Sequence, residues 1–142
     1  MIVLDTNVVS ELMRPRPNGL VHAWLDEQGK TECYLTATTV AEVLFGIERL
    51  PAGTRRNHLA KEFSLMLAED FAGRVLSFDQ PATAYYARVA ASRQAMGRPV
   101  SVADAQIAGI CLQHGATLAT RNTKDFTDCG LNVIDPWTAS AN

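Results

Sequence analysis

The fold of this chain is decided by its first twelve residues, Met1-Ile2-Val3-Leu4-Asp5-Thr6-Asn7-Val8-Val9-Ser10-Glu11-Leu12. A short apolar run ends in an acid and two small polar residues, and a new apolar pattern then begins, which predicts a buried strand followed by a helix. Asp5 therefore stands at the carboxyl end of the strand, the edge where open parallel α/β sheets bind ligands. The alternative is that Asp5, Thr6 and Asn7 only cap the helix. Other acids near Asp5 would favour a ligand-binding role over a purely capping role.

Length and composition bound the class of protein. The 142 residues, 47% of them hydrophobic, suffice for one core, and we assign residues 1–142 to a single domain. No apolar stretch is long enough to span a bilayer and no signal-peptide pattern is present, so we expect a soluble cytoplasmic protein. The net charge of −2 means that any nucleic-acid contact must be local. Cys33, Cys111 and Cys129 lack metal-site spacing and are expected to be buried thiols.

Beyond residue 12, short apolar runs alternate with helical patterns. The runs predict further strands at 34–36, 75–78, 116–120 and 132–135, with helices between them, including one opened by Thr38 or Thr39 and one opened by Ser101. Such alternation implies right-handed crossovers and a parallel sheet covered on both faces. The predicted class is a three-layer α/β/α sandwich with a parallel sheet of four or five strands. The orientation of the helix near residues 82–97 stays open, because two helices separate the third and fourth strands.

Several polar side chains are predicted to reach the edge that Asp5 occupies. A crossover helix begins at the carboxyl edge of the strand before it, and Glu42 and Asp104 each fall in the first turn of a predicted helix. Asn122 and Asp125 directly follow the fourth strand. Each acid also fits a purely local role, because the segments 39–42, 101–104 and 122–125 have the spacing of capping boxes.

Convergence of these carboxylates would indicate a bound cation. Carboxylates from three crossovers on one edge repel one another unless a cation or protonation compensates them. Oxygen donors without paired histidines select Mg²⁺ or Mn²⁺ rather than zinc. Such a metal activates water for phosphodiester hydrolysis, so a nuclease is the leading reaction class. Neither a glycine-rich nucleotide motif nor a serine or cysteine nucleophile with a partnered base is evident.

Four segments carry a resemblance to a known family. In chain order they are Val3–Leu12, Thr39–Gly46, Ala103–Ala108 and Leu118–Phe126, spread over nearly the whole sequence. Together they resemble the PIN-domain ribonucleases, and within them the VapC/FitB-like toxins of bacterial type II toxin–antitoxin systems. The resemblance implies a parallel sheet of strand order 3-2-1-4-5. It also implies an endoribonuclease toxin that depends on Mg²⁺ or Mn²⁺.

The same resemblance implies roles and partners. Asp5, Glu42 and Asp104 are implied to bind the metal and to form the catalytic set together with Asn122, which stands where many relatives carry a fourth acid. An amide contributes an oxygen but no charge, so one or two metal ions and the part of Asp125 stay open. The implied partners are an RNA substrate, a cognate antitoxin, operator DNA bound only through that antitoxin, and a second copy of the chain in a homodimer, with no membrane.

Two other functions compete with the ribonuclease. A catalytically silent PIN-like module that only pairs with a DNA-binding regulator predicts no metal-dependent cleavage. A different Mg²⁺-dependent phosphohydrolase built on Asp5 is disfavoured, since Asn7 stands where its second acid would be. For the ribonuclease, phosphate contacts are expected from Arg14, Arg98 and Arg121.

Overall fold

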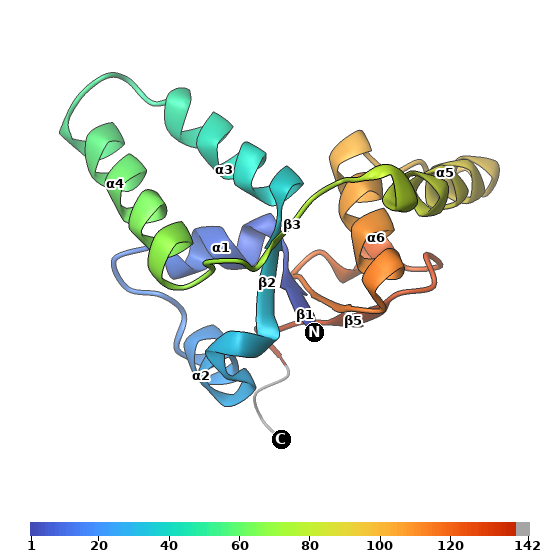
Figure 1. The fold of residues 1–142 in the computed structure, drawn as a ribbon, viewed down its shortest axis with the longest axis horizontal. Helices are drawn as coiled ribbons and strands as arrows, with labels where there is room; N and C mark the ends of the chain where they lie inside the picture. The colour runs from blue at the N-terminus through green and yellow to red at the C-terminus, as the bar shows by residue number, and fades with distance from the viewer. Residues whose placement is uncertain (139–142) are drawn as a thin grey trace.

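The strand predicted at residues 2–4 lies at the centre of a parallel sheet. In the computed structural model, which describes residues 1–138, β1 (Ile2–Leu4) pairs with β2 (Cys33–Thr36) on one side and with β4 (Thr117–Ala119) on the other. β3 (Val75–Leu76) and β5 (Asn132–Ile134) complete the order β3-β2-β1-β4-β5, with every pair parallel (Figure 1). The predicted sheet and its strand order are confirmed. Residues 139–142 of the predicted domain lie outside the described residues.

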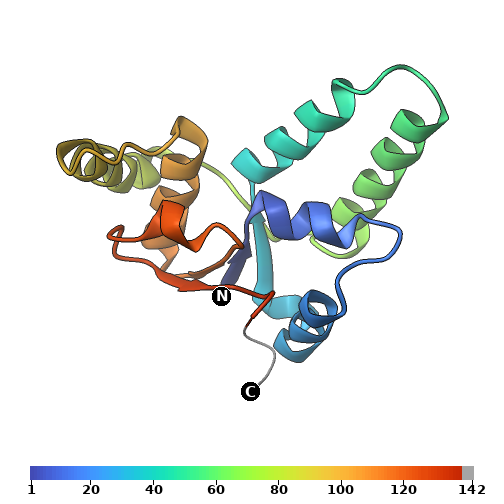
Figure 2. The same cartoon turned by 180° about the vertical axis from the view of Figure 1, so that it is seen from behind.

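Within residues 1–138, six α-helices connect these strands: α1 (Thr6–Leu12), α2 (Gly19–Gln28), α3 (Ala37–Glu48), α4 (Thr54–Glu69), α5 (Gln80–Ala95) and α6 (Val102–His114). Two short 3-10 turns, η1 (Lys30–Glu32) and η2 (Thr123–Phe126), precede β2 and follow β4. Figures 1 and 2 show α3 and α4 as a hairpin on one side of the central strands, with α5 and α6 on the other. None of the helices in this part of the chain combines the length and the apolar run that a bilayer crossing needs.

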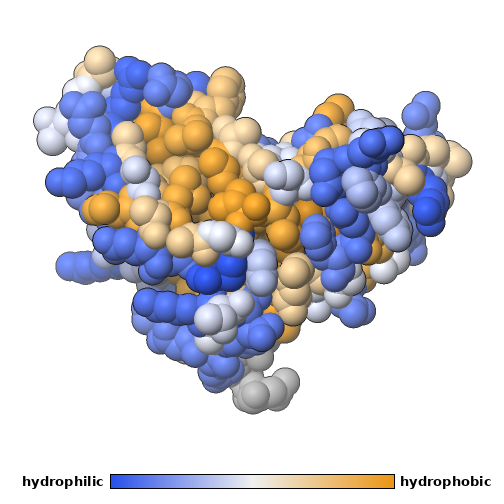
Figure 3. Space-filling view, in the orientation of Figure 1, coloured by the Kyte–Doolittle hydropathy of each residue, from blue (hydrophilic) through white to orange (hydrophobic). Residues whose placement is uncertain are grey.

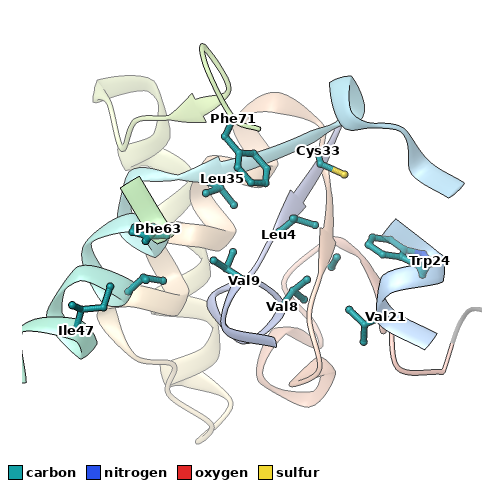
Figure 4. Close-up of a cluster of buried hydrophobic side chains, with 12 residues drawn as sticks. Leu4, Val8, Val9, Val21, Trp24, Cys33, Leu35, Ile47, Phe63 and Phe71 are labelled. Carbon is teal, nitrogen blue, oxygen red and sulfur yellow. The ribbon is translucent and has the colours of Figure 1, made fainter. Parts of the chain in front are cut away.

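The three central strands, β1, β2 and β4, are largely buried on both faces, as their apolar runs predict, whereas the edge strands β3 and β5 are partly exposed. Leu4 packs into a cluster contributed by α1 to α4, whereas its neighbour Val3 packs into a second cluster contributed mainly by α5 and α6. The first cluster, drawn in Figure 4, includes Leu4, Val8, Val9, Val21, Trp24, Leu35, Val43, Ile47 and Phe63. The second includes Val3, Val89, Ile107, Ala108, Cys111, Leu118 and Phe126. Cys33, Cys111 and Cys129 are buried and unpaired, as predicted.

The orientation of α5 is set by its packing on α6. At Gly109 of α6, a Cβ atom would lie 2.9 Å from the backbone nitrogen of Tyr86 in α5, so the two backbones approach as closely as glycine allows. Near the other end of the contact, Gln113 Nε2 donates a hydrogen bond to Asp79 Oδ2 at 3.4 Å. The two helices are therefore antiparallel, and the carboxyl end of α5 lies beside the amino end of α6.

Two predicted capping boxes are wrong. α3 begins at Ala37 rather than at Thr38 or Thr39, because Thr36 is its cap and accepts a hydrogen bond from Thr39 N at 3.0 Å. Glu42 therefore lies in the second turn of α3, not the first. Asn122 makes no side-chain cap to η2. The predicted cap of α6 is confirmed, since Ser101 Oγ accepts a hydrogen bond from Asp104 N at 3.1 Å.

The third strand is also shorter than predicted. β3 ends at Leu76 instead of continuing to Phe78. Val75 and Leu76 pair only with β2, because β3 stands at the edge of the sheet. The remaining strand ends agree with the prediction to within one residue.

Candidate active site

Asp5 is a nearly buried carboxylate at the carboxyl end of β1, with 4% of its surface exposed. Its Oδ1 accepts a hydrogen bond from Thr6 N at 2.8 Å, and its Oδ2 accepts one from Thr120 Oγ1 at 2.7 Å and one from Asn7 Nδ2 at 3.3 Å. Burial raises the pKa of Asp5, and the charge of Glu42 acts in the same direction, although these hydrogen bonds oppose the shift. Helix capping accounts for the hydrogen bond from Thr6 N but not for those from Thr120 and Asn7.

Asn7 joins the segments that follow β1 and β4. Its Nδ2 donates to Thr120 Oγ1 at 3.1 Å as well as to Asp5, and its Oδ1 accepts a hydrogen bond from Arg121 N at 3.1 Å. Neither Asn7 nor Thr120 is among the residues predicted from the sequence to form this edge. Asn7 lies in the first turn of α1 and Thr120 directly follows β4. Their polar side chains near the carboxyl ends of buried strands are the sequence signal that points to this role.

Glu42 reaches the same edge from the second turn of α3. Its carboxylate is exposed, and Oε1 accepts a hydrogen bond from Thr6 Oγ1 at 2.7 Å. Thr6 Oγ1 also lies 3.2 Å from Thr39 Oγ1, so a pair of threonine hydroxyls connects the start of α1 with the start of α3. The hydrogen bond from Thr6 holds Glu42 beside the β1–α1 junction.

Asp104 is half-buried in the first turn of α6. Burial raises the pKa of its carboxyl to about 6, with the charge of Asp5 as the next contribution and smaller ones from Asp125 and Glu42, while hydrogen bonding with Ser101 lowers it. The charges of the three other acids therefore all reach Asp104. The structure brings Asp5, Glu42, Asp104 and Asp125 to one edge of the sheet, as the topology argument predicted.

Asn122 stands at the rim of this edge. Its side chain is exposed, and its backbone N–H donates to Thr120 Oγ1 at 3.1 Å, so the hydroxyl that binds Asp5 also fixes the start of this loop. The catalytic role of Asn122 stays a prediction.

The three arginines predicted to contact phosphate are each engaged with a neighbour. Arg14 pairs with the buried Glu11 at 3.3 Å, and Arg98 pairs with Asp128 at 2.5 Å. The guanidinium of Arg121 lies over the ring of Trp137, 5.0 Å from its centroid. All three remain exposed, and their contact with RNA stays a prediction.

The donor set at the edge fits a hard divalent cation. Within residues 1–138, no three histidine, cysteine or acidic side chains are spaced to hold one metal ion together. Mg²⁺, however, is commonly bound by only one or two carboxylates, with water completing its shell. The raised pKa values of Asp5 and Asp104 mark two carboxylates whose charges are incompletely compensated by the protein, and a cation would compensate them.

A comparison with known families identifies the family to which this fold belongs. The family model described as PIN domain matches residues 2–130, and the chain belongs to the PIN-domain family. The resemblance drawn from the four sequence segments is thereby confirmed.

Three curated relatives align over almost the whole chain. The plasmid stability protein StbB of Pseudomonas syringae pv. tomato is 48% identical and covers 98% of this chain and 100% of its own. The VapC ribonuclease Y4jK of Sinorhizobium fredii is 43% identical, covering 96% of this chain and 98% of its own. The toxin FitB of Neisseria gonorrhoeae is 42% identical, covering 96% and 99%.

A solved structure shares the fold closely. The structure of FitAB bound to IR36 DNA fragment superposes with a TM-score of 0.89 and 42% sequence identity, covering 96% of each chain. In that structure the relative is part of a complex with DNA.

Proposed function

We propose that this protein is a divalent-metal-dependent endoribonuclease and the toxin of a toxin–antitoxin pair. The observation that carries the proposal is the buried Asp5 carboxylate, held by hydrogen bonds at the sheet edge where the charges of Asp104, Glu42 and Asp125 converge. The relatives named as a VapC ribonuclease and as the toxin FitB support it.

Each residue has a distinct part in this proposal. Asp5 and Asp104 hold the cation, with Glu42 beside them and fixed by the Thr6 hydroxyl. Asn122 offers an amide oxygen at the rim, toward the substrate. When bound, a divalent cation supplies an activated water and neutralises charge on the phosphodiester. Thr120 and Asn7 keep the Asp5 carboxylate in one orientation while RNA binds and leaves.

The test is cleavage of total cellular RNA by purified protein freed of any bound partner. Reactions contain Mg²⁺, Mn²⁺ or a chelator, and compare wild type with Asp5→Asn and with Asp26→Asn. Asp26 is an exposed acid on α2 that pairs with His22, so its variant makes the same charge change away from the edge. Discrete fragments that need the metal and Asp5, but not Asp26, are expected. Equal cleavage by Asp5→Asn would exclude the proposed site.

One observation favours the silent module as a second candidate. The acids at the edge are not spaced as three joint ligands of one ion within the described residues. A module that only pairs with a regulator predicts no cleavage with either metal and no calorimetric binding of Mg²⁺ that depends on Asp5. Titration of Mg²⁺ into wild type and Asp5→Asn therefore separates the two candidates without relying on a chosen RNA.

A groove beside the acids supports an antitoxin partner. It has a volume of about 910 Å³, lies between α1, α3 and α4, and includes Thr6 and Glu42 in its lining. The rest of its lining is mainly apolar and includes Leu12, Met13, Val43, Ile47, Leu59 and Met66. We assign this groove to a segment of the antitoxin, which would cover Glu42, and operator DNA would be bound through that antitoxin.

Gly46 offers a way to close this groove without disturbing the core. It lines the groove, and a Cβ atom at this position would meet nothing within 4 Å. Gly46→Phe should abolish co-purification with the co-expressed antitoxin while RNA cleavage persists. Gly46→Ala is the control, because it leaves the groove open and favours the helix by up to about 1 kcal/mol. Undiminished antitoxin binding by Gly46→Phe would remove the groove from the proposal.

The proposed homodimer is supported by exposed apolar side chains. Leu44, Leu65 and Val75 are 45%, 43% and 39% exposed, on α3, α4 and β3. Figure 3 shows apolar surface gathered over these elements on one face of the molecule. If a second copy covers this face, Leu65→Glu should shift the mass measured by light scattering from dimer to monomer. A dimer that persists would place the interface elsewhere.

A further inference from the structure

Arg93 of α5 is a buried cation that the proposed chemistry does not use. It is 5% exposed, and within residues 1–138 none of the ion pairs involves it. A guanidinium taken out of water without a counter-charge is unfavourable unless its N–H groups are hydrogen-bonded. The partners of this guanidinium therefore indicate what the residue does.

Its close partners are backbone carbonyls of two different loops, and Cys129 Sγ lies farther from Nη1, at 3.8 Å. Nε donates to Arg98 O at 2.9 Å, in the loop between α5 and α6. Nη1 donates to Asp125 O at 3.0 Å and to Thr127 O at 2.9 Å, in the segment between β4 and β5. A guanidinium is a rigid planar fork of five donors, so one side chain can hold two segments in a fixed relation.

Both segments lead directly to acids of the candidate active site. The loop that contains Arg98 ends at Ser101, the cap that places Asp104 in the first turn of α6. The other segment contains Asp125, which belongs to the acidic edge. The Arg98–Asp128 ion pair, at 2.5 Å and exposed, joins the same two segments from the solvent side. Arg93 and this pair thus form an inner and an outer link between them.

We propose that Arg93 is a positioning residue for RNA cleavage, whose guanidinium clamps the α5–α6 loop to the β4–β5 segment and so sets the separation of Asp104 and Asp125. The inference rests on the proposed ribonuclease function. Arg93 acts through two backbones rather than by contact with RNA, so its effect belongs to the catalytic step and not to substrate binding.

Arg93→Lys tests the geometry, because lysine keeps the charge and loses the planar fork. The chain supplies a matched control in Arg74, which is half-buried and also holds two backbone carbonyls. Its Nε donates to Cys33 O at 3.1 Å, and its Nη2 donates to Asp70 O. These carbonyls belong to β2 and to the end of α4, not to the acidic edge. Arg74→Lys should therefore reproduce the loss of stability without the loss of alignment.

Steady-state cleavage is measured well below the unfolding midpoint of each variant. Arg93→Lys should lower kcat by about tenfold or more with KM for RNA unchanged, because small misplacements of reacting groups cost large factors in rate. Arg74→Lys should stay within about twofold of wild type. In an Asp125→Asn background, Arg93→Lys should have a smaller further effect on kcat than in wild type, since part of its action passes through the separation of Asp104 and Asp125. Effects that multiply, or an equal loss in Arg74→Lys, would overturn the proposal.

A second readout does not depend on activity. In metal-free protein, amide hydrogen exchange at residues 96–101 and 122–128 should be faster in Arg93→Lys than in wild type and unchanged in Arg74→Lys. Unchanged exchange at both segments would overturn the clamp. Absence of cleavage by the wild type would instead reject the ribonuclease, while the exchange result would still decide whether Arg93 holds the two loops.

If Arg93→Lys does not fold, Asp128→Asn tests the outer link alone. Asp128 has a φ of 60°, a left-handed conformation that asparagine also tolerates, so the change removes the ion pair without adding strain. Faster exchange in the same two segments and a loss of about two- to threefold in kcat are expected. Wild-type behaviour in both measurements would overturn the proposal.

Discussion

The amino ends of α6 and α3 both bring an acid to the sheet edge, but the two acids are held in different ways. Asp104 lies inside the cap of its own helix, three residues after Ser101, and is half-buried among like charges. Glu42 lies a full turn beyond the cap Thr36, is exposed, and is held by the hydroxyl of Thr6 from another element. The position of Asp104 is therefore fixed by its own helix, and nearby like charges disfavour its ionised form. The position of Glu42 depends instead on a contact with another element.

The largest expected effect is on catalysis, where the two acids should behave alike. Asp104→Asn and Glu42→Gln should each reduce metal-dependent RNA cleavage more than about 100-fold, since even residues that only support a metal site alter activity by about 10–100-fold. Initial rates with Mg²⁺ in excess measure this. Wild-type activity in either variant would remove that acid from the catalytic set.

A smaller effect on RNA cleavage should distinguish Glu42 from Asp104, because only Glu42 is held by the Thr6 hydroxyl. Thr6→Val keeps the shape of the side chain and deletes the hydroxyl that binds Glu42 Oε1 at 2.7 Å. Cleavage should fall by about tenfold, as for other groups that orient a ligand. Ser10→Ala, a change in the same helix at a residue that also lines the groove, is the control and should leave the rate unaltered. Equal rates for Thr6→Val and wild type would show that Glu42 does not depend on the hydrogen bond from Thr6.

The free energy of unfolding should also distinguish the two acids, but here the change at Asp104 should have the larger effect. The folded-state pKa of Asp104 is raised from 3.8 to about 6, so its stabilising contribution is present at low pH and is lost as the pH rises through about 6. In chelator at pH 8, Asp104→Asn should raise the free energy of unfolding by about 1–2 kcal/mol, a value discounted because the group is partly solvated.

At pH 4 the gain from Asp104→Asn should nearly vanish, because the native carboxyl is then protonated as well. Urea unfolding at both pH values measures the difference. Glu42→Gln, at an exposed position, should change stability little at either pH. A variant at Asp104 that is less stable than wild type at pH 8 would contradict the predicted charge strain.

The smallest effects concern the caps themselves. Ser101→Ala and Thr36→Val each remove a cap hydroxyl and should lower the free energy of unfolding by about 1 kcal/mol. Only Ser101→Ala should also reduce cleavage, by about threefold, because Asp104 belongs to the capped turn and Glu42 does not. The same rate loss in Thr36→Val would show that Glu42 depends on its own cap after all.

The sheet and the acidic edge could be predicted from the sequence because each rests on a local pattern repeated along the chain. Apolar runs ending in Asp5 or Thr36 mark strand ends, and parallel topology gathers the residues that follow them at one edge. The turn of α3 that carries Glu42 was mispredicted because three threonines precede it and any of them can cap. The threonine that caps α3 is Thr36, the last residue of β2.

The parts that could not be predicted depend on contacts between distant segments. The antiparallel packing of α5 on α6 is fixed by a close approach at Gly109, and no local signal distinguishes this glycine from one that merely ends a helix. Arg93 looks in the sequence like any polar residue on an exposed helix face. Its burial follows from carbonyl partners more than thirty residues away in η2 and its flank.

The pairing of β1 with β4 determines when the candidate active site can form during synthesis. Thr120, whose hydroxyl fixes Asp5, is separated from it by 115 positions in the chain. At about 5–20 residues per second, roughly 6–23 seconds of translation separate the two residues. An amino-terminal fragment that stops before β4 lacks both the central pairing and the Asp5 contact. Fragments that end before β4 should therefore lack the proposed cleavage activity, and a nascent chain should gain it only after β4 has been made.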